Sequence, residues 1–403
     1  MFRTIALVAG LLALSSLAHA DDWPHFRGPG YDNISEERGW SAEALSPEPS
    51  IAWRAEIGIG YSGPAVVGDA VYVLGYADGQ EHVRRLNADT GDVVWTHSYP
   101  GAKIDTLNAG GPGATPTVVG DVVYTNGREG QVHCLKTADG AVVWSLKLPE
   151  AYEVQVPDWG FTTSPLLADG KLILDAGRLV ALDPATGKEV WKSDKEHKPG
   201  YGTPTPFAFG GEKYLAHLNN DGLSVAKLSD GAELGFYKID AQFDTAGTSP
   251  IVRDDTIWIS VGYDGRAALL KFDGDSLKQV YVSRKIKNHF SNSIVIGDHI
   301  YGISGQTNHS RTCMLVCLEY ATGELAWEQS GGGFGSLVAA DGNLIYLNDV
   351  GTAAIIPANP EKFEFISKGD ILDGQCWTAP VLANGKLYCR NSEGSLVVVN
   401  MMK

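Results

Sequence analysis

Aromatic and polar side chains recur immediately before a repeated strand pattern, and these side chains are the best candidates for binding chemistry. The candidates are Tyr61, Trp159, Phe161, Tyr201, His289, Phe290, Asn292, Phe334 and Trp377. Aromatic rings gathered around an opening can stack on a quinone, a sugar ring or a peptide side chain. The alternative is that these rings only cover the apolar core beneath each loop.

An internal repeat predicts the elements that position these residues. Each unit opens with a small polar residue and usually a proline, continues as an apolar strand, and then turns at Gly or Asp, as in SGPAVVGD from Ser62. The opening position is occupied by Pro64, Pro116, Pro165, Pro206, Pro250, Ser293, Ser336 and Pro380. The mean spacing of about 45 residues is the length of a four-stranded propeller blade. Eight such positions predict eight blades.

A second signature closes each unit and predicts how neighbouring blades pack. A strand ends, an Asp/Gly turn follows, and a β-branched run returns as the outer strand. A tryptophan ends that run and can fill the gap to the next blade. These structural tryptophans are Trp53, Trp95, Trp144, Trp191 and Trp327. Weaker copies place Tyr281, Phe365 and Gly235 in the same position.

The two ends of the repeat region predict how the ring closes. The last unit has three strands, and the missing fourth matches residues 49–57, where Trp53 occupies the tryptophan position. We therefore expect an all-β, eight-bladed β-propeller of four-stranded antiparallel blades, closed by pairing of an N-terminal strand into the C-terminal blade. The expected organisation is a signal peptide (1–20), an N-terminal arm (21–49) and the propeller (50–403).

The closing pattern A-x-D-x-x-x-G-x-x-x-W at residues 181–191 resembles the tryptophan-docking repeat of propellers named after pyrroloquinoline quinone (PQQ). That superfamily includes quinoprotein alcohol dehydrogenases and the outer-membrane assembly protein BamB. The segment WPHFRGPG at residues 23–30 is similar to the start of secreted members of this group. The resemblance covers about residues 50–403 and implies the fold. It does not imply a function, because enzymes and non-enzymes share the repeat.

The dehydrogenase branch implies PQQ held with calcium and an aspartate base. Asp158 and Asp244 are weak candidates for that base, and Asn288 or Asn292 for calcium ligands. The sequence lacks the adjacent cysteine pair of many such enzymes and any compact acidic loop, although calcium takes about six oxygen ligands. A catalytic residue is therefore not assigned, no metal site is expected, and PQQ with calcium is kept only as an alternative.

The positions of the cysteines and histidines favour structural roles over catalytic or metal-binding ones. Cys134 and Cys317 occupy one repeat position, which favours a core role, and the five cysteines leave at least one unpaired within the chain. Cys376 beside Trp377 is a weaker candidate for a reactive thiol. No C-x-x-C, H-E-x-x-H or G-x-S-x-G motif occurs.

The first twenty residues predict export. A basic start and a short apolar run lead to Ala18-His19-Ala20, an A-x-A signature with cleavage expected after Ala20. No lipobox cysteine or later membrane span is expected, which places the chain in the periplasm or outside the cell. A formal charge of −16 excludes nucleic acid as a partner class.

The sequence thus predicts a monomeric ligand- or protein-binding scaffold of the cell envelope, with a protein, a glycan or a small molecule as the open choices of partner. The alternative is a small PQQ- and calcium-dependent oxidoreductase acting on an alcohol or sugar.

Overall fold

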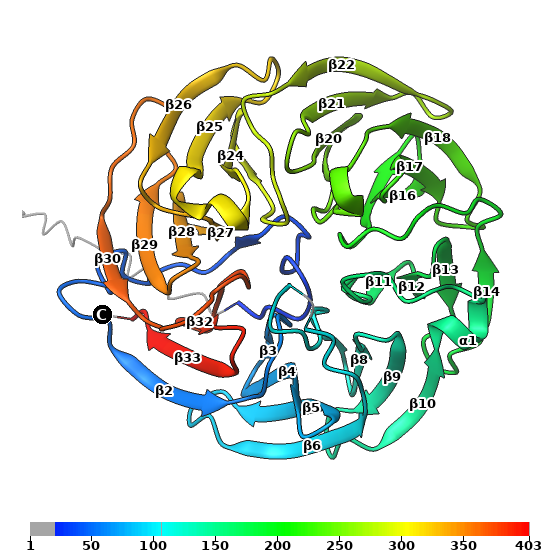
Figure 1. Ribbon diagram of the computed structural model, residues 1–403, viewed down its shortest axis with the longest axis horizontal. Coiled ribbons are helices and arrows are strands. Elements are labelled where there is room, and N and C mark those ends of the chain that lie inside the picture. Colours follow the sequence, from blue (N-terminus) through cyan, green and yellow to red (C-terminus); the bar gives the residue numbers. More distant parts are fainter. Residues whose placement is uncertain (1–20, 106, 403) are drawn as a thin grey trace, which may run out of the picture.

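The computed structural model describes residues 21–105 and 107–402, and within them eight antiparallel sheets are arranged radially around one axis (Figure 1). Each inner strand begins within one residue of one of the eight opening positions of the repeat. The predicted all-β, eight-bladed propeller is therefore confirmed. The expected signal segment, residues 1–20, lies outside the described residues.

The first four blades follow the chain from the innermost to the outermost strand. Blade 1 is β3 (Ala65–Val67), β4 (Ala70–Ala77), β5 (Gln80–Asn87) and β6 (Val93–Pro100). Blade 2 is β7 (Thr117–Val119), β8 (Val122–Asn126), β9 (Gln131–Lys136) and β10 (Val142–Lys147). Blade 3 is β11 (Leu166–Ala168), β12 (Lys171–Asp175), β13 (Leu179–Leu182) and β14 (Glu189–Lys192). Blade 4 is β15 (Thr205–Phe209), β16 (Glu212–Leu218), β17 (Gly222–Lys227) and β18 (Glu233–Lys238).

The other four blades repeat this order and complete the ring. Blade 5 is β19 (Ile251–Arg253), β20 (Thr256–Ser260), β21 (Ala267–Phe272) and β22 (Leu277–Ser283). Blade 6 is β23 (Ile294–Ile296), β24 (His299–Ser304), β25 (Met314–Glu319) and β26 (Leu325–Ser330). Blade 7 is β27 (Gly335–Ala340), β28 (Asn343–Asn348), β29 (Thr352–Pro357) and β30 (Ser367–Asp370). Blade 8 is β31 (Val381–Ala383), β32 (Lys386–Arg390), β33 (Ser395–Asn400) and β2 (Ile51–Glu56).

Blade 8 contains strands from both ends of the repeat region. β2 pairs antiparallel with β33, in a register that places Ile51 opposite Val399 and Glu56 opposite Ser395. The N-terminal strand thus supplies the outer strand that the last unit lacks, as predicted. This pairing covers the edge of β33 and joins the two ends of the ring (Figure 1).

Tryptophans near the start of five outer strands bind those blades to the next one in the ring. The indole Nε1 of Trp53 donates to the carbonyl of Ala88 at 2.9 Å, and Trp95, Trp144, Trp191 and Trp327 make the same kind of bond to the following blade. The indole of Trp53 lies so close to Gly91 that a Cβ there would approach its ring to 2.6 Å. Tyr281 substitutes between blades 5 and 6, where its hydroxyl donates to the carbonyl of Tyr320.

The N-terminal arm closes one end of the central channel. Trp23 bridges Val66 of β3, and β1 (Ile34–Ser35) adds to β27 as a parallel fifth strand. The arm therefore crosses from blade 1 to blade 7, and it runs in dark blue through the centre of Figure 1. These contacts are near the ends of the inner strands, opposite the loops that precede them. The channel is consequently closed at the arm and open at those loops.

Three short helical segments complete the described structure. They are α1 (Leu148–Tyr152), η1 (Gln242–Asp244) and η2 (Thr307–Thr312). Within the described residues, no helix has the length and apolar character needed to cross a membrane.

Candidate functional site

A cavity of about 700 Å³ occupies the centre of the ring, between the loops that precede the inner strands and the N-terminal arm. We call it the funnel. Its walls carry most of the predicted binding residues, namely Tyr61, Trp159, Tyr201, His289, Phe290, Asn292 and Trp377. Its floor includes Trp23, Phe26 and Arg27 of the arm. Pockets of this size hold small molecules or short segments of a partner.

Phe161 and Phe334, the other two predicted residues, lie behind the funnel wall. Both side chains are buried, Phe161 against the turn at Gly130 and Phe334 against Phe290 at a ring distance of 4.9 Å. They support the wall and do not line the cavity. For these two rings the structure agrees with the packing alternative.

The aromatic wall is a continuous series of ring contacts on one side of the funnel. Tyr61 stacks on Trp377 at 5.7 Å, and Trp377 contacts Phe290 at 5.4 Å. The Tyr61 hydroxyl donates to Gln375 and accepts from the backbone of Ala109, each at 3.0 Å. Rings held in this way present a rigid apolar surface at little cost in side-chain entropy.

His289 extends this wall and is held without charge. Its ring contacts Tyr263 at 4.8 Å, and its Nδ1 has no hydrogen-bond partner among the described residues. Burial lowers the pKa of His289 to about 4, because the charged imidazolium would lose its hydration. At neutral pH this side chain contributes a neutral, polar ring to the funnel.

The two weak catalytic candidates lie outside the funnel lining. Asp158 is exposed, and Asp244 in η1 is half-exposed with its carboxylate 3.0 Å from the Lys198 ammonium. Neither carboxylate faces the cavity that would have to hold a substrate. The structure therefore does not bring them together with the aromatic wall.

The residues of the funnel fit poorly with a calcium-bound cofactor. Within the described residues, the lining contains no aspartate or glutamate, and no group of three His, Cys, Asp or Glu side chains is arranged to hold a metal. Asn288 is not free to ligate, since its Oδ1 accepts from Ser293 and its Nδ2 donates to Ile303. Calcium needs several such oxygen atoms, so we derive no step through PQQ and calcium.

Two buried arginines line the funnel and were not among the predicted binding residues. Arg27 projects from the arm, and Arg128 lies in the turn between β8 and β9. The sequence signal for Arg27 was its place in the WPHFRGPG segment, which suggests an arm that shapes one end of the channel. Arg128 is flanked by Gly127 and Gly130, a pattern typical of an exposed hairpin turn, so nothing local indicates its burial.

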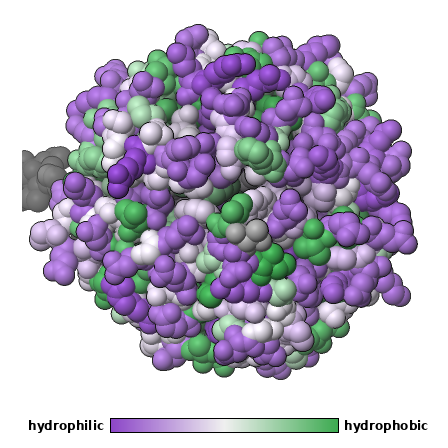
Figure 2. Space-filling view, viewed as in Figure 1, coloured by the Kyte–Doolittle hydropathy of each residue, from purple (hydrophilic) through white to green (hydrophobic). Residues whose placement is uncertain are grey.

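Large apolar side chains are exposed around the open end of the funnel. Leu107 is 76% exposed and Phe243 is 67% exposed. Both belong to loops that precede inner strands, and we call these two residues the rim. Figure 2 shows a central hollow with hydrophobic side chains gathered beside it. Exposed apolar residues next to a cavity are typical of interaction sites.

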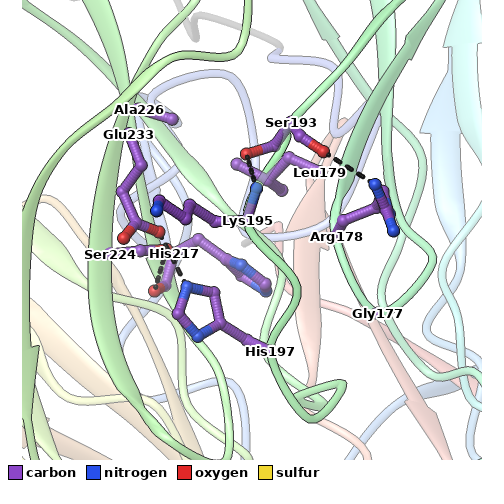
Figure 3. Close-up of a pocket in the computed structure, with 10 residues that line it drawn as sticks. All are labelled: Gly177, Arg178, Leu179, Ser193, Lys195, His197, His217, Ser224, Ala226 and Glu233. Carbon is purple, nitrogen blue, oxygen red and sulfur yellow. Dashed lines mark hydrogen bonds and ion pairs between the residues drawn. The ribbon is translucent and has the colours of Figure 1, made fainter.

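A second, much smaller cavity lies between blades 3 and 4 (Figure 3). The His197 Nε2 and Glu233 Oε2 atoms are 2.7 Å apart, and this hydrogen bond raises the pKa of His197. His217 Nε2 lies 3.1 Å from the buried Asp175 carboxylate. The volume of about 10 Å³ is enough for about one water. These contacts join neighbouring blades and leave no room for a ligand.

All five cysteines are free and buried. Burial raises the pKa of Cys376 to about 12, so its thiol stays protonated and shielded. The hypothesis of a reactive Cys376 thiol is wrong, because its side chain is buried in the apolar core.

Comparison with known proteins places this chain among its relatives. The sequence model of the family described as outer membrane protein assembly factor BamB matches residues 79–329. BamB of Escherichia coli strain K12 is 35% identical over 111 residues, which are 25% of this chain and 26% of that protein. The aligned part therefore spans about a quarter of the length of this relative.

Solved structures extend the likeness to the whole ring. BamB from Moraxella catarrhalis has a TM-score of 0.60 at 16% identity and covers 86% of this chain and 97% of its own. Quinohemoprotein alcohol dehydrogenase from Comamonas testosteroni has a TM-score of 0.70 at 13% identity and covers 95% and 81%. At these identities the likeness shows a shared fold. Because the matched family model covers more than half of its residues, the chain belongs to the BamB family of PQQ-like β-propellers.

Proposed function

We propose that this chain is an exported scaffold of the cell envelope that docks a partner protein on the face where the funnel opens. The observation that carries the proposal is the exposed apolar rim, Leu107 and Phe243, beside an aromatic cavity closed at its far end. Exposed apolar side chains at the mouth of a cavity are typical of interaction sites, and a partner that covered Leu107 and Phe243 would remove both from water. Its family membership favours a role in the assembly of outer-membrane proteins.

The ring supports this role because it is a fixed platform with variable loops. Indole hydrogen bonds join successive blades, so the loops that precede the inner strands are held in constant relative positions. Loops on a rigid scaffold suit recognition. The oxidoreductase alternative has weaker support, since the carboxylates that would hold calcium or act as a base are not in the funnel lining of the described chain.

Genetic complementation tests the proposal. Deleting the gene in the organism that encodes it should lower the amounts of its outer-membrane β-barrel proteins, measured by quantitative proteomics of isolated membranes. Wild-type protein should restore them, and a double variant with Leu107→Ser and Phe243→Ser should not. Both changes are at exposed positions, so we expect the fold to be retained, which thermal unfolding checks.

The control removes another exposed apolar side chain, one on the outside of the ring. Val94 in β6 is 50% exposed, and Val94→Ser should restore the barrel proteins as well as wild type does. Full restoration by the rim double variant would contradict docking at the funnel face. An unchanged membrane proteome after deletion would contradict the assembly role itself.

A further inference from the structure

The charges inside the funnel are opposite in sign to those of the molecule. The chain has a formal charge of −16, whereas the charged side chains in the described funnel lining are Arg27 and Arg128, with no carboxylate among them. Each arginine is 3% exposed. Burying a cation costs free energy unless an opposite charge or hydrogen-bond acceptors compensate it. The contacts that each guanidinium lacks therefore indicate the kind of ligand that would complete them.

The Arg27 guanidinium is only partly satisfied at the floor of the funnel. Its Nη1 donates to the Pro250 carbonyl at 3.1 Å and reaches the Thr205 hydroxyl at 3.4 Å. Its Nε has no partner among the described residues. Burial lowers the pKa of Arg27 to about 10, partly offset by the charge of Asp32, and the group remains charged at neutral pH.

The Arg128 guanidinium, higher on the wall, has the same incomplete set of contacts. Its Nη1 donates to the Trp159 carbonyl at 2.8 Å and to the Gly111 carbonyl at 3.4 Å, and its Nε has no partner among the described residues. The nearby Glu81 carboxylate accepts from the backbone N–H of Arg128 and from the Tyr99 hydroxyl. Glu81 therefore lies close enough to influence Arg128 without forming an ion pair with its guanidinium.

Arg390 shows what a purely structural arginine looks like in this fold. It is fully buried behind the wall, and its Nε, Nη1 and Nη2 all donate to backbone carbonyls, including those of Ser62 and Gly58. Arg390 does not line the funnel. In Arg27 and Arg128, by contrast, neither Nε nor Nη2 makes a hydrogen bond to another described residue.

We propose that the funnel takes up an extended segment of a partner protein in which carboxylate side chains alternate with aromatic or apolar ones. The carboxylates pair with Arg128 and Arg27, and the apolar side chains lie against Tyr61, Trp377 and Phe290. Guanidinium and carboxylate form strong, charge-assisted hydrogen bonds, which are strengthened where water is excluded. The inference rests on the proposed docking of a protein, because the rim and the funnel then form one continuous binding surface.

Fluorescence anisotropy with short labelled peptides tests this directly. The probes are three acetylated, amidated hexapeptides in which phenylalanine alternates with glutamate, glutamine or lysine. Wild-type protein should bind the glutamate peptide about tenfold or more tightly than the glutamine peptide. The overall negative charge alone would favour the lysine peptide, so a preference for glutamate reports the local arginines.

Two variants test whether Arg128 and Arg27 cause the preference for the glutamate peptide. Arg128→Gln and Arg27→Gln should each reduce the glutamate-to-glutamine ratio by about fivefold or more, while binding of the glutamine peptide stays within twofold and so controls for folding. Lys198→Gln removes an exposed cation paired with Asp244 outside the funnel and should leave the ratio unchanged. Equal binding of the glutamate and glutamine peptides would overturn the inference, as would a ratio that neither arginine variant alters.

A competition experiment decides whether the natural ligand of the funnel is a peptide segment or a small molecule. Free PQQ, a planar aromatic carboxylate, should not displace the glutamate peptide at equimolar concentration, and displacement would overturn the peptide assignment in favour of a small ligand. Failure of all three peptides to bind would also overturn it. The docking proposal would survive either failure, because the rim variants test it through membrane composition.

Discussion

At the scale of single residues, buried histidines make the stability of this fold depend on pH. His289 in the funnel wall and His133 in β9 are each 8% exposed, and burial lowers the pKa of both to about 4. The unfolded chain titrates near the ordinary value of 6.5 and so takes up protons first as the pH falls. Each histidine therefore removes stability between about pH 6.5 and pH 4.

We predict that His289→Gln reduces the pH dependence of unfolding. Each neutral buried histidine should lower the free energy of unfolding by about 2 kcal/mol between pH 7 and pH 5. Urea unfolding of wild type and variant at both pH values measures this difference. His197 is a control with the opposite pH dependence. Its hydrogen bond to Glu233 raises its pKa, so the stability that it contributes is lost as the pH rises. Parallel pH curves for wild type and His289→Gln would contradict the neutral state of His289.

At the scale of elements, the docking of tryptophans links five of the blades to the blade that follows. Trp53 is the clearest case, because it lies in β2, the strand that closes the ring. Its ring packs beside Gly91 of blade 1, and its Nε1 donates to Ala88. One side chain thus links the last blade to the first.

We predict that Trp53→Ala lowers the free energy of unfolding by about 3–5 kcal/mol, the usual cost of truncating a buried aromatic side chain. Chemical denaturation followed by circular dichroism measures the change. Val94→Ala, on an exposed face of an outer strand, should change it by less than about 0.5 kcal/mol. A loss below about 1 kcal/mol for Trp53→Ala would show that ring closure does not depend on this contact.

The elements were largely predictable because each carries its own local signal. Strand, Asp/Gly turn and tryptophan recur along the chain, and the unmatched strand around Trp53 indicated the closure. The funnel was predictable only in part. Neighbouring loop residues such as Phe161 and Trp159 follow no period, so sequence cannot say which ring faces the cavity. The burial of Arg128 arises from distant contacts with Trp159 and Gly111, which no local pattern reports.

At the scale of the whole molecule, a closed ring joins three surfaces with different chemistry. The exterior is acidic, the funnel is aromatic with two cations, and the rim between them is apolar. The arm closes the far end of the channel, so access is from the rim side. A partner that covered the rim would therefore reach Arg27, on the arm at the floor of the funnel, last.

Site-specific photo-crosslinking is the most direct test of docking at this face. Benzoylphenylalanine would replace Leu107 or Phe243 at the rim and, as controls, Val94 or Phe236 on outer strands, both of which are exposed. Irradiation in intact cells should yield one discrete adduct from the rim positions, identified by mass spectrometry as an outer-membrane assembly protein, and none from the controls. Adducts from the outer strands alone, or equal adducts from all four positions, would contradict the funnel face as the docking surface.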